Sequence, residues 1–135
     1  MKPKYKKSRS GYEDRIRANL DQRGIKYGYE TRSFTYRKII CKHCGETAVE
    51  ASYTPDFIFD GGLPLVVEAK GYWDTEDRNK LKLVLRDNPG IDIRFILQRD
   101  QAIRKGSKTK YGMILDKLGV PWCTGTEIPW EWIPK

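Results

Sequence analysis

Three charged residues in the middle of the chain, Asp56, Glu68 and Lys70, have types and a spacing that could carry out chemistry. The two acids flank a turn-prone run at 60–62, and the short apolar runs on either side of it predict a β-hairpin. Pairing about that turn places Asp56 opposite Glu68, and the two-residue period of a strand puts Lys70 on the face that carries Glu68. Two acids can bind a divalent cation, and a nearby lysine can orient or activate a water. The pattern therefore indicates metal-dependent hydrolysis of a phosphodiester.

A purely structural role for the same residues is also open. Lys70 can simply offset the charge of Glu68 in an ion pair on a solvated sheet face. The runs at 53–59 and 65–69 are strongly β-forming and apolar, however, so we expect their acids at a buried or half-buried sheet end. A buried acid needs a partner or a metal ion, and this requirement favours the metal site.

Glu13 has two interpretations. Ser10 and Glu13 have the spacing of a capping box, in which Glu13 only bonds the backbone amide of Ser10. On a helical wheel Glu13 also borders the apolar stripe formed by Tyr12, Ile16 and Leu20, so it can lean toward the core as a third acid. The sequence does not separate these two roles.

Helix signals occur at three places. The first predicted helix opens at residue 10 and ends near Gly24, a typical helix stop. Thr75 is a good N-cap for a second helix, which ends at 88–90. A last helix is expected near 109–118.

Strand signals complete the expected fold. Besides the hairpin, strands are predicted at 25–29, 34–40 and 91–97. The tail at 121–133 is aromatic and too apolar to be a free extension. With no internal repeat, the sequence predicts one mixed α/β domain, and the length of 135 residues suits one domain better than two.

The formal net charge of +8 is unevenly distributed. Five basic residues fall among the first ten, and six lie between positions 99 and 117, where they face only two acids. A polyanion is the natural partner of such clusters. A solubilising tail and a solvated face would look the same, so charge alone does not decide.

Cysteine content and hydropathy bear on the compartment. No apolar run approaches membrane-spanning length, and the N-terminus has no apolar signal-peptide core. An odd number of cysteines, three, suits a reducing environment. We therefore expect a cytoplasmic protein with no membrane partner.

Short motifs add a more specific signal because they follow one another along nearly the whole chain. They read SGYED at 10–14, YTPDF at 53–57, EAKG at 68–71, DIR at 92–94, KGS at 105–107, YG at 111–112, IP at 128–129 and EWI at 131–133. In these motifs and their order the chain resembles the bacteriophage endonuclease I family of Holliday junction resolvases. That family lies within the PD-(D/E)XK, or restriction-endonuclease-like, superfamily.

The resemblance implies a role for each acid. Asp56 and Glu68 would bind one or two divalent ions, Mg²⁺ or Mn²⁺, with the backbone carbonyl of Ala69 as a further ligand. Lys70 would position or activate the attacking water, and Glu13 would complete the acidic cluster as a possible metal ligand. Hard oxygen ligands suit these two ions.

The resemblance also implies a fold and an assembly. The fold would be a restriction-endonuclease-like α/β mixed sheet flanked by helices, with a basic flexible arm at 1–9 and a single nuclease domain at 10–135. In a homodimer the segment 10–40 would be exchanged, and 41–52 would form the bridge between the halves. Glu13 of one chain would then meet the acids of the other, and two active sites would make paired nicks in branched double-stranded DNA.

Phosphate contacts are predicted from position in the chain. The candidates are Lys6, Lys7 and Arg9 on the arm and Lys105, Lys108 and Lys110 in the late loop. Recognition by such residues would depend on the shape of the junction and the position of its phosphates rather than on base edges.

Cys41 and Cys44 form a CxxC turn for which the family resemblance does not account. Such a turn is half of a structural zinc site, which needs four ligands. We hypothesise a Zn²⁺ ion shared between subunits, with both cysteines from each chain; a metal-free turn with two reduced thiols is the alternative. Metal analysis of the purified dimer that finds less than roughly half a zinc per chain would exclude the shared site.

Two other functions stay open at this point. One is a mismatch-repair or restriction-type nicking endonuclease on the same fold. The other is a non-catalytic basic nucleic-acid-binding module in which the acids are structural and the CxxC turn belongs to a zinc fold.

Overall fold

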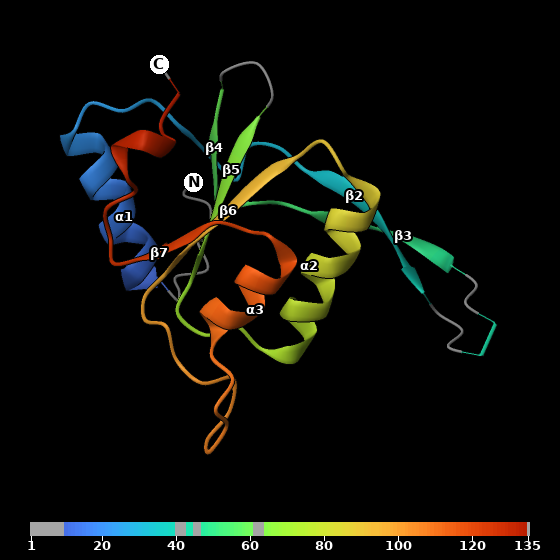
Figure 1. The fold of residues 1–135 in the computed structure, drawn as a ribbon. Coiled ribbons are helices and arrows are strands. Elements are labelled where there is room, and N and C mark those ends of the chain that lie inside the picture. Colours follow the sequence, from blue (N-terminus) through green and yellow to red (C-terminus); the bar gives the residue numbers. More distant parts are fainter. Residues whose placement is uncertain (1–9, 40–42, 45–46, 61–63, 135) are drawn as a thin grey trace.

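The computed structural model describes residues 10–39, 43–44, 47–60 and 64–134 (Figure 1). Its elements, in chain order, are α1 (Ser10–Gln22), β1 (Gly28–Tyr29), β2 (Phe34–Ile39), β3 (Thr47–Tyr53), β4 (Phe57–Phe59), β5 (Leu65–Lys70), α2 (Thr75–Asp87), β6 (Asp92–Leu97), α3 (Tyr111–Leu118), β7 (Trp122–Thr124) and the 3₁₀ turn η1 (Trp130–Trp132). Among the described residues, no helix has the length and apolar character needed to cross a membrane.

A five-stranded mixed sheet forms the centre of the molecule, in the order β1-β4-β5-β6-β7. β4 is antiparallel to both β1 and β5. β5, β6 and β7 run parallel, because α2 and α3 each carry the chain back across the sheet before the next strand. The predicted α/β architecture, a mixed sheet flanked by helices, is confirmed.

The two faces of the sheet are covered by different helices (Figure 1). Ile16 and Leu20 of α1, both fully buried, pack with Phe57 and Val67 on one face. On the other face Leu115 of α3 joins a second apolar cluster together with residues of α2. Alternate residues of β4 and β5 therefore point into different clusters, which explains why both strands are apolar along their whole length.

A separate two-stranded sheet, formed by β2 and β3, extends away from the main sheet beside α2 (Figure 1). Tyr36 of β2 and Tyr53 of β3 are buried in the same apolar cluster as α2. β3 lies directly before Asp56, so this sheet leads into the central hairpin.

The first predicted strand is shorter than expected, because only Gly28 and Tyr29 pair with β4. Ile25 belongs instead to the end of α1. Its N–H donates to the carbonyl of Leu20 at 3.0 Å, and Gly24 has a φ of 70°. This is the glycine-terminated helix end, in which the residue after the glycine satisfies a free carbonyl.

Two predicted helix starts also shift. Asp74, not Thr75, caps α2, with its carboxylate accepting from the N–H of Asp77 at 2.8 Å. The last helix starts at Tyr111 rather than near residue 109, because Lys110 is extended and pairs with Ala102. The aromatic tail is packed as predicted, with Ile128 fully buried against the α1 face.

Candidate active site

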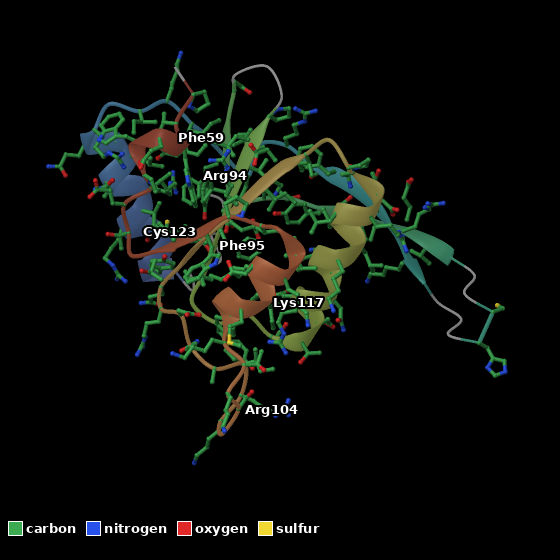
Figure 2. All side chains as sticks on the ribbon, viewed as in Figure 1. Phe59, Arg94, Phe95, Arg104, Lys117 and Cys123 are labelled. Carbon is green, nitrogen blue, oxygen red and sulfur yellow. The ribbon has the colours of Figure 1, made fainter. Side chains whose placement is uncertain are left out.

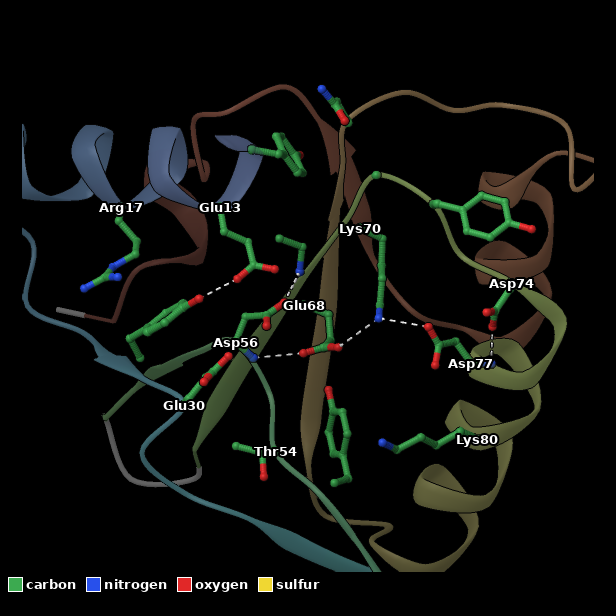
Figure 3. A pocket seen from close by; sticks show the side chains of 17 residues that line it. Glu13, Arg17, Glu30, Thr54, Asp56, Glu68, Lys70, Asp74, Asp77 and Lys80 are labelled. Carbon is green, nitrogen blue, oxygen red and sulfur yellow. Dashed lines mark hydrogen bonds and ion pairs between the residues drawn. The ribbon is translucent and has the colours of Figure 1, made fainter. Parts of the chain in front are cut away.

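The β4–β5 hairpin brings the two central acids together (Figure 3). Phe57 pairs with Val67, so Asp56 and Glu68 are the next residues along the two strands. The N–H of Asp56 donates to Glu68 Oε1, and the N–H of Ala69 donates to Asp56 Oδ2, each at 2.9 Å. At the end of the β4–β5 ladder, the two carboxylates thus accept the hydrogen bonds that backbone carbonyls accept elsewhere in the sheet. These hydrogen bonds fix the orientation of both side chains.

Lys70 lies between Glu68 and the start of α2 (Figure 3). Its Nζ is 3.9 Å from Glu68 Oε2 and 3.2 Å from Asp77 Oδ2. Glu68 is 7% exposed and is the only charged residue classed as buried among the described residues. An ion pair does exist, but the solvated sheet face that a purely structural role assumed does not.

Glu13 reaches the same site from α1. Its Oε1 accepts a hydrogen bond from the hydroxyl of Tyr29 at 2.5 Å. Carboxylate oxygens of Glu13, Glu30 and Asp56 lie within 4.8 Å of one another. Of its two sequence interpretations, the structure therefore favours the third acid, and it places Glu13 beside Asp56 of the same chain.

Glu30 is a residue that the sequence analysis missed. It follows β1, has a φ of 54°, and donates its backbone N–H to the carbonyl of Asp56 at 2.9 Å. Only the antiparallel pairing of Tyr29 with Phe57 brings it beside Asp56. The sequence had one usable signal, an acid directly after a strand, and this signal is too common to select a residue.

The concentration of negative charge changes the acid–base behaviour of the site. Burial raises the pKa of Asp56 well above its usual range, and the neighbouring charges of Glu68 and Glu13 raise it further. Burial also raises the pKa of Glu68, although Lys70 and the Asp56 N–H oppose this. The charged forms of these acids are therefore disfavoured despite Lys70, and a divalent cation would stabilise them.

Lys70 remains charged in this environment. Burial lowers its pKa, but the carboxylates of Glu68, Asp77 and Asp56 together outweigh burial and raise the pKa above its usual value. At neutral pH the side chain is therefore an ammonium ion that donates hydrogen bonds. It can orient a water or stabilise developing negative charge, and it has no free lone pair with which to accept a proton.

The acids face an open cleft of about 1150 Å³. Arg17 and Lys80 line it on opposite sides of the acids (Figure 3). The hydroxyl of Tyr53 also lines it and lies beside the carboxylate of Glu68. Carboxylate oxygens and room for water fit a hard cation such as Mg²⁺ or Mn²⁺. Ala69 lines the same cleft, so its predicted role as a carbonyl ligand is sterically open.

The predicted phosphate contacts lie elsewhere. Lys105, Lys108 and Lys110 are exposed in the loop between β6 and α3, and none of the three lines the cleft. This loop projects from the body of the molecule, with the exposed Arg104 in its outer part (Figure 2). Lys6, Lys7 and Arg9 fall outside the described residues.

Only one of the two cysteines of the CxxC turn lies among the described residues. Cys41 falls outside the described residues, and Cys44 is exposed. Cys123 is far from both in sequence, lies on β7 and packs against the α1 face of the sheet, where burial raises the pKa of its thiol to about 11. Among the described residues, the group of acids and sulfurs close enough to hold an ion is the carboxylate cluster of Glu13, Glu30 and Asp56.

Comparison with known proteins agrees with the site. The family model of phage endonuclease I matches residues 2–135. The chain is 36% identical over 128 residues to Endonuclease I of Escherichia phage T7, covering 94% of this chain and 78% of that protein. It is 35% identical over 113 residues to Endodeoxyribonuclease 1 of Enterobacteria phage T3, covering 83% and 68% of the two chains. With a match that runs from the basic arm to the aromatic tail, the chain belongs to the phage endonuclease I family.

Proposed function

We propose that this endonuclease is a metal-dependent deoxyribonuclease that resolves four-way DNA junctions, and related branched DNA, by paired nicks. The proposal depends most on one observation, the hydrogen-bonded arrangement of Asp56 and Glu68 with Lys70 beside it in an open cleft. Membership of the endonuclease family supports it. Its site of action would be the cytoplasm of the infected host.

Each residue of the site has a distinct role in this proposal. Asp56 and Glu68 hold Mg²⁺ or Mn²⁺, with the Ala69 carbonyl, Glu13 and Glu30 available as further oxygen ligands. When bound there, the cation supplies Lewis-acid activation of water and neutralises charge on the leaving oxygen. Lys70, kept protonated by its acidic neighbours, holds the water in line with the phosphate and stabilises the charge that develops on the phosphate oxygens.

The charge distribution suggests how the substrate is held. The acidic centre repels a phosphate backbone, so affinity must come from cations around it. Arg17 and Lys80 lie within the cleft, and the exposed lysines of the β6–α3 loop extend the basic surface. We expect these residues and the arm to bind phosphates, with a steep loss of affinity as salt increases.

Junction selectivity is tested by comparing substrates. The purified protein should nick a synthetic four-way junction in Mg²⁺ and make no cuts in EDTA. A mismatch-containing duplex and a fully paired duplex of the same sequence serve as competitors in the same gel assay. Equal cutting of the paired duplex would contradict junction selectivity, and cutting in EDTA would contradict metal dependence.

A homodimer with exchanged N-terminal segments belongs to the same proposal. Exchange of identical segments recreates in a dimer the contacts that each segment makes within one chain. Here α1 packs on the β4–β5 hairpin, and Glu13 lies beside Asp56. In an exchanged dimer these contacts would connect two chains, with the predicted bridge at 41–52 between the two halves.

Mixed dimers distinguish the exchanged arrangement from the closed one. Glu13→Ala and Asp56→Asn homodimers should both be inactive. Co-expressed as an exchanged heterodimer, they would form one site with both mutations and one with neither, so nicking of one strand should return to about half the wild-type rate. In a closed arrangement each site keeps one mutation and the heterodimer stays inactive. A monomeric mass in solution would also contradict the proposal.

A further inference from the structure

Tyr72 is an aromatic residue that the proposed chemistry does not use. At 71% exposed, it is the most exposed large hydrophobic side chain among the described residues. It follows Lys70 by two positions and lines the cleft that contains the acids. Its side chain forms no hydrogen bond, ion pair or ring contact with any described residue. Its π-face is therefore open to a ligand in the cleft.

The backbone on both sides of Tyr72 is held in place. Gly71 O accepts from Gln101 Nε2 at 3.0 Å, and the N–H of Trp73 donates to the Tyr111 hydroxyl at 3.1 Å. Trp73 itself is 1% exposed, with its ring against those of Phe95 and Tyr111. The backbone that carries Tyr72 is thus already fixed. Ligand binding would need to order only the side-chain rotamer of Tyr72.

We infer that Tyr72 is a stacking site for a nucleobase at the branch point, beside the phosphate that is cut. The inference rests on the proposed function, which brings DNA to Lys70. Two residues span at most roughly 7 Å along a chain, so a strand whose phosphate lies at Lys70 brings its adjacent bases within reach of Tyr72. A base inside a duplex is stacked on both faces, and its π-face becomes available where the helices part. The site would therefore favour branched over continuous DNA.

Stacking on a tyrosine suits this task because every base has a π-face. Base–aromatic stacking is sequence-tolerant and strong enough to change affinity by roughly five- to a hundredfold. The ring also loses little conformational freedom, having only two rotatable bonds. Tyr72 would thus contribute to the recognition of branch structure without imposing a sequence.

The test uses full-length protein in EDTA, so that binding is measured without cleavage, and a junction with 2-aminopurine at the branch. Wild type should quench the fluorescence of the 2-aminopurine. Tyr72→Ala should lose the quenching and bind the junction roughly five- to a hundredfold more weakly, while its affinity for continuous duplex stays unchanged. Tyr72→Phe should behave as wild type, because it keeps the ring.

Trp130→Ala is the matched control, since Trp130 is 58% exposed but does not line the cleft. The inference would be overturned if Tyr72→Ala and Trp130→Ala had the same junction affinity and the same quenching. An equal loss in Tyr72→Phe and Tyr72→Ala would also overturn it, because it would assign the contact to the hydroxyl. If the wild-type protein fails to nick junctions in Mg²⁺, both the proposed function and this inference are wrong. If the wild-type protein nicks junctions normally but Tyr72→Ala keeps its junction affinity and its quenching, only this inference is wrong.

Discussion

Asp56→Asn is expected to abolish cleavage and, in the absence of metal, to make the protein more stable. Asparagine keeps an oxygen that can accept from the Ala69 N–H, so the hairpin closure at 2.9 Å survives. The substitution removes a half-buried carboxylate, whose pKa is raised by desolvation, by Glu68 and by Glu13. A metal ligand is lost at the same time, so one change should move stability and activity in opposite directions.

Both effects are large enough to measure. We expect nicking in Mg²⁺ to fall by roughly a thousandfold or more, about 4 kcal/mol of transition-state stabilisation. In EDTA the melting temperature should rise, by about 3 to 5 °C for each kcal/mol of stability gained. Asp74→Asn is a control, because Asp74 lines the cleft but caps α2, and asparagine caps a helix about as well as aspartate, so the melting temperature should change little. A metal-free Asp56→Asn protein that melts below wild type would contradict the charge argument.

The pH dependence of stability gives a second readout of the same substitution. Because the folded pKa of Asp56 and of Glu68 lies above the unfolded value of about 4, the folded chain retains protons that the unfolded chain has released. These two groups therefore make metal-free stability fall as pH rises from about 4 through their folded pKa values. In Asp56→Asn the fall in stability with rising pH should be shallower than in wild type. Saturating Mn²⁺ should remove much of this pH dependence from wild type but little from the variant.

Lys70→Ala is expected to remove most of the cleavage while leaving junction binding nearly intact. The ammonium group is the one cation within 4.0 Å of Glu68 among the described residues, so the substitution removes the group proposed to hold the attacking water. A loss of roughly 10²- to 10⁴-fold in the single-turnover nicking rate is the usual effect of removing such a group. Binding should persist because phosphate contacts come mainly from other residues.

Lys108→Ala is the matched control, since Lys108 is an exposed lysine outside the cleft. It should weaken junction binding and reduce its salt dependence, with no change in the nicking rate of the bound complex. Titrating the junction with each variant in EDTA and then adding Mg²⁺ separates the two effects. Normal nicking by Lys70→Ala would remove Lys70 from the active site.

The sequence predicted the local part of the site well because a hairpin is a local structure. Once the turn-prone sequence at 60–62 is recognised, the strand period places Asp56, Glu68 and Lys70 without reference to the rest of the chain. Glu30 and Asp77 were not predicted as partners, because each comes from an element whose position depends on tertiary packing. Nothing in their own neighbourhoods distinguishes them from ordinary surface acids.

Some of the predicted boundaries of helices and strands were wrong, for local reasons. Ile25 was assigned to a strand by its apolar side chain, yet its N–H is needed by the end of α1. Thr75 and Asp74 are both good caps, and the spacing to the Asp77 N–H selects Asp74. The exchange of the segment 10–40 depends on a second chain, and neither residue types nor periodicity contain that information.

The reciprocal bonds that close the hairpin determine how the acids can share a cation. One oxygen of Asp56 and one of Glu68 accept backbone N–H groups, so the second oxygen of each is left for other partners. Each acid would then act as a single-oxygen ligand, already in its binding rotamer before any ion arrives. Mg²⁺ prefers six ligands and gives up water reluctantly, so such a site leaves several positions for water and phosphate. The hairpin closure would thereby limit how many coordination positions of a bound cation the protein fills, and a cation with positions left for water could exchange ligands during a reaction.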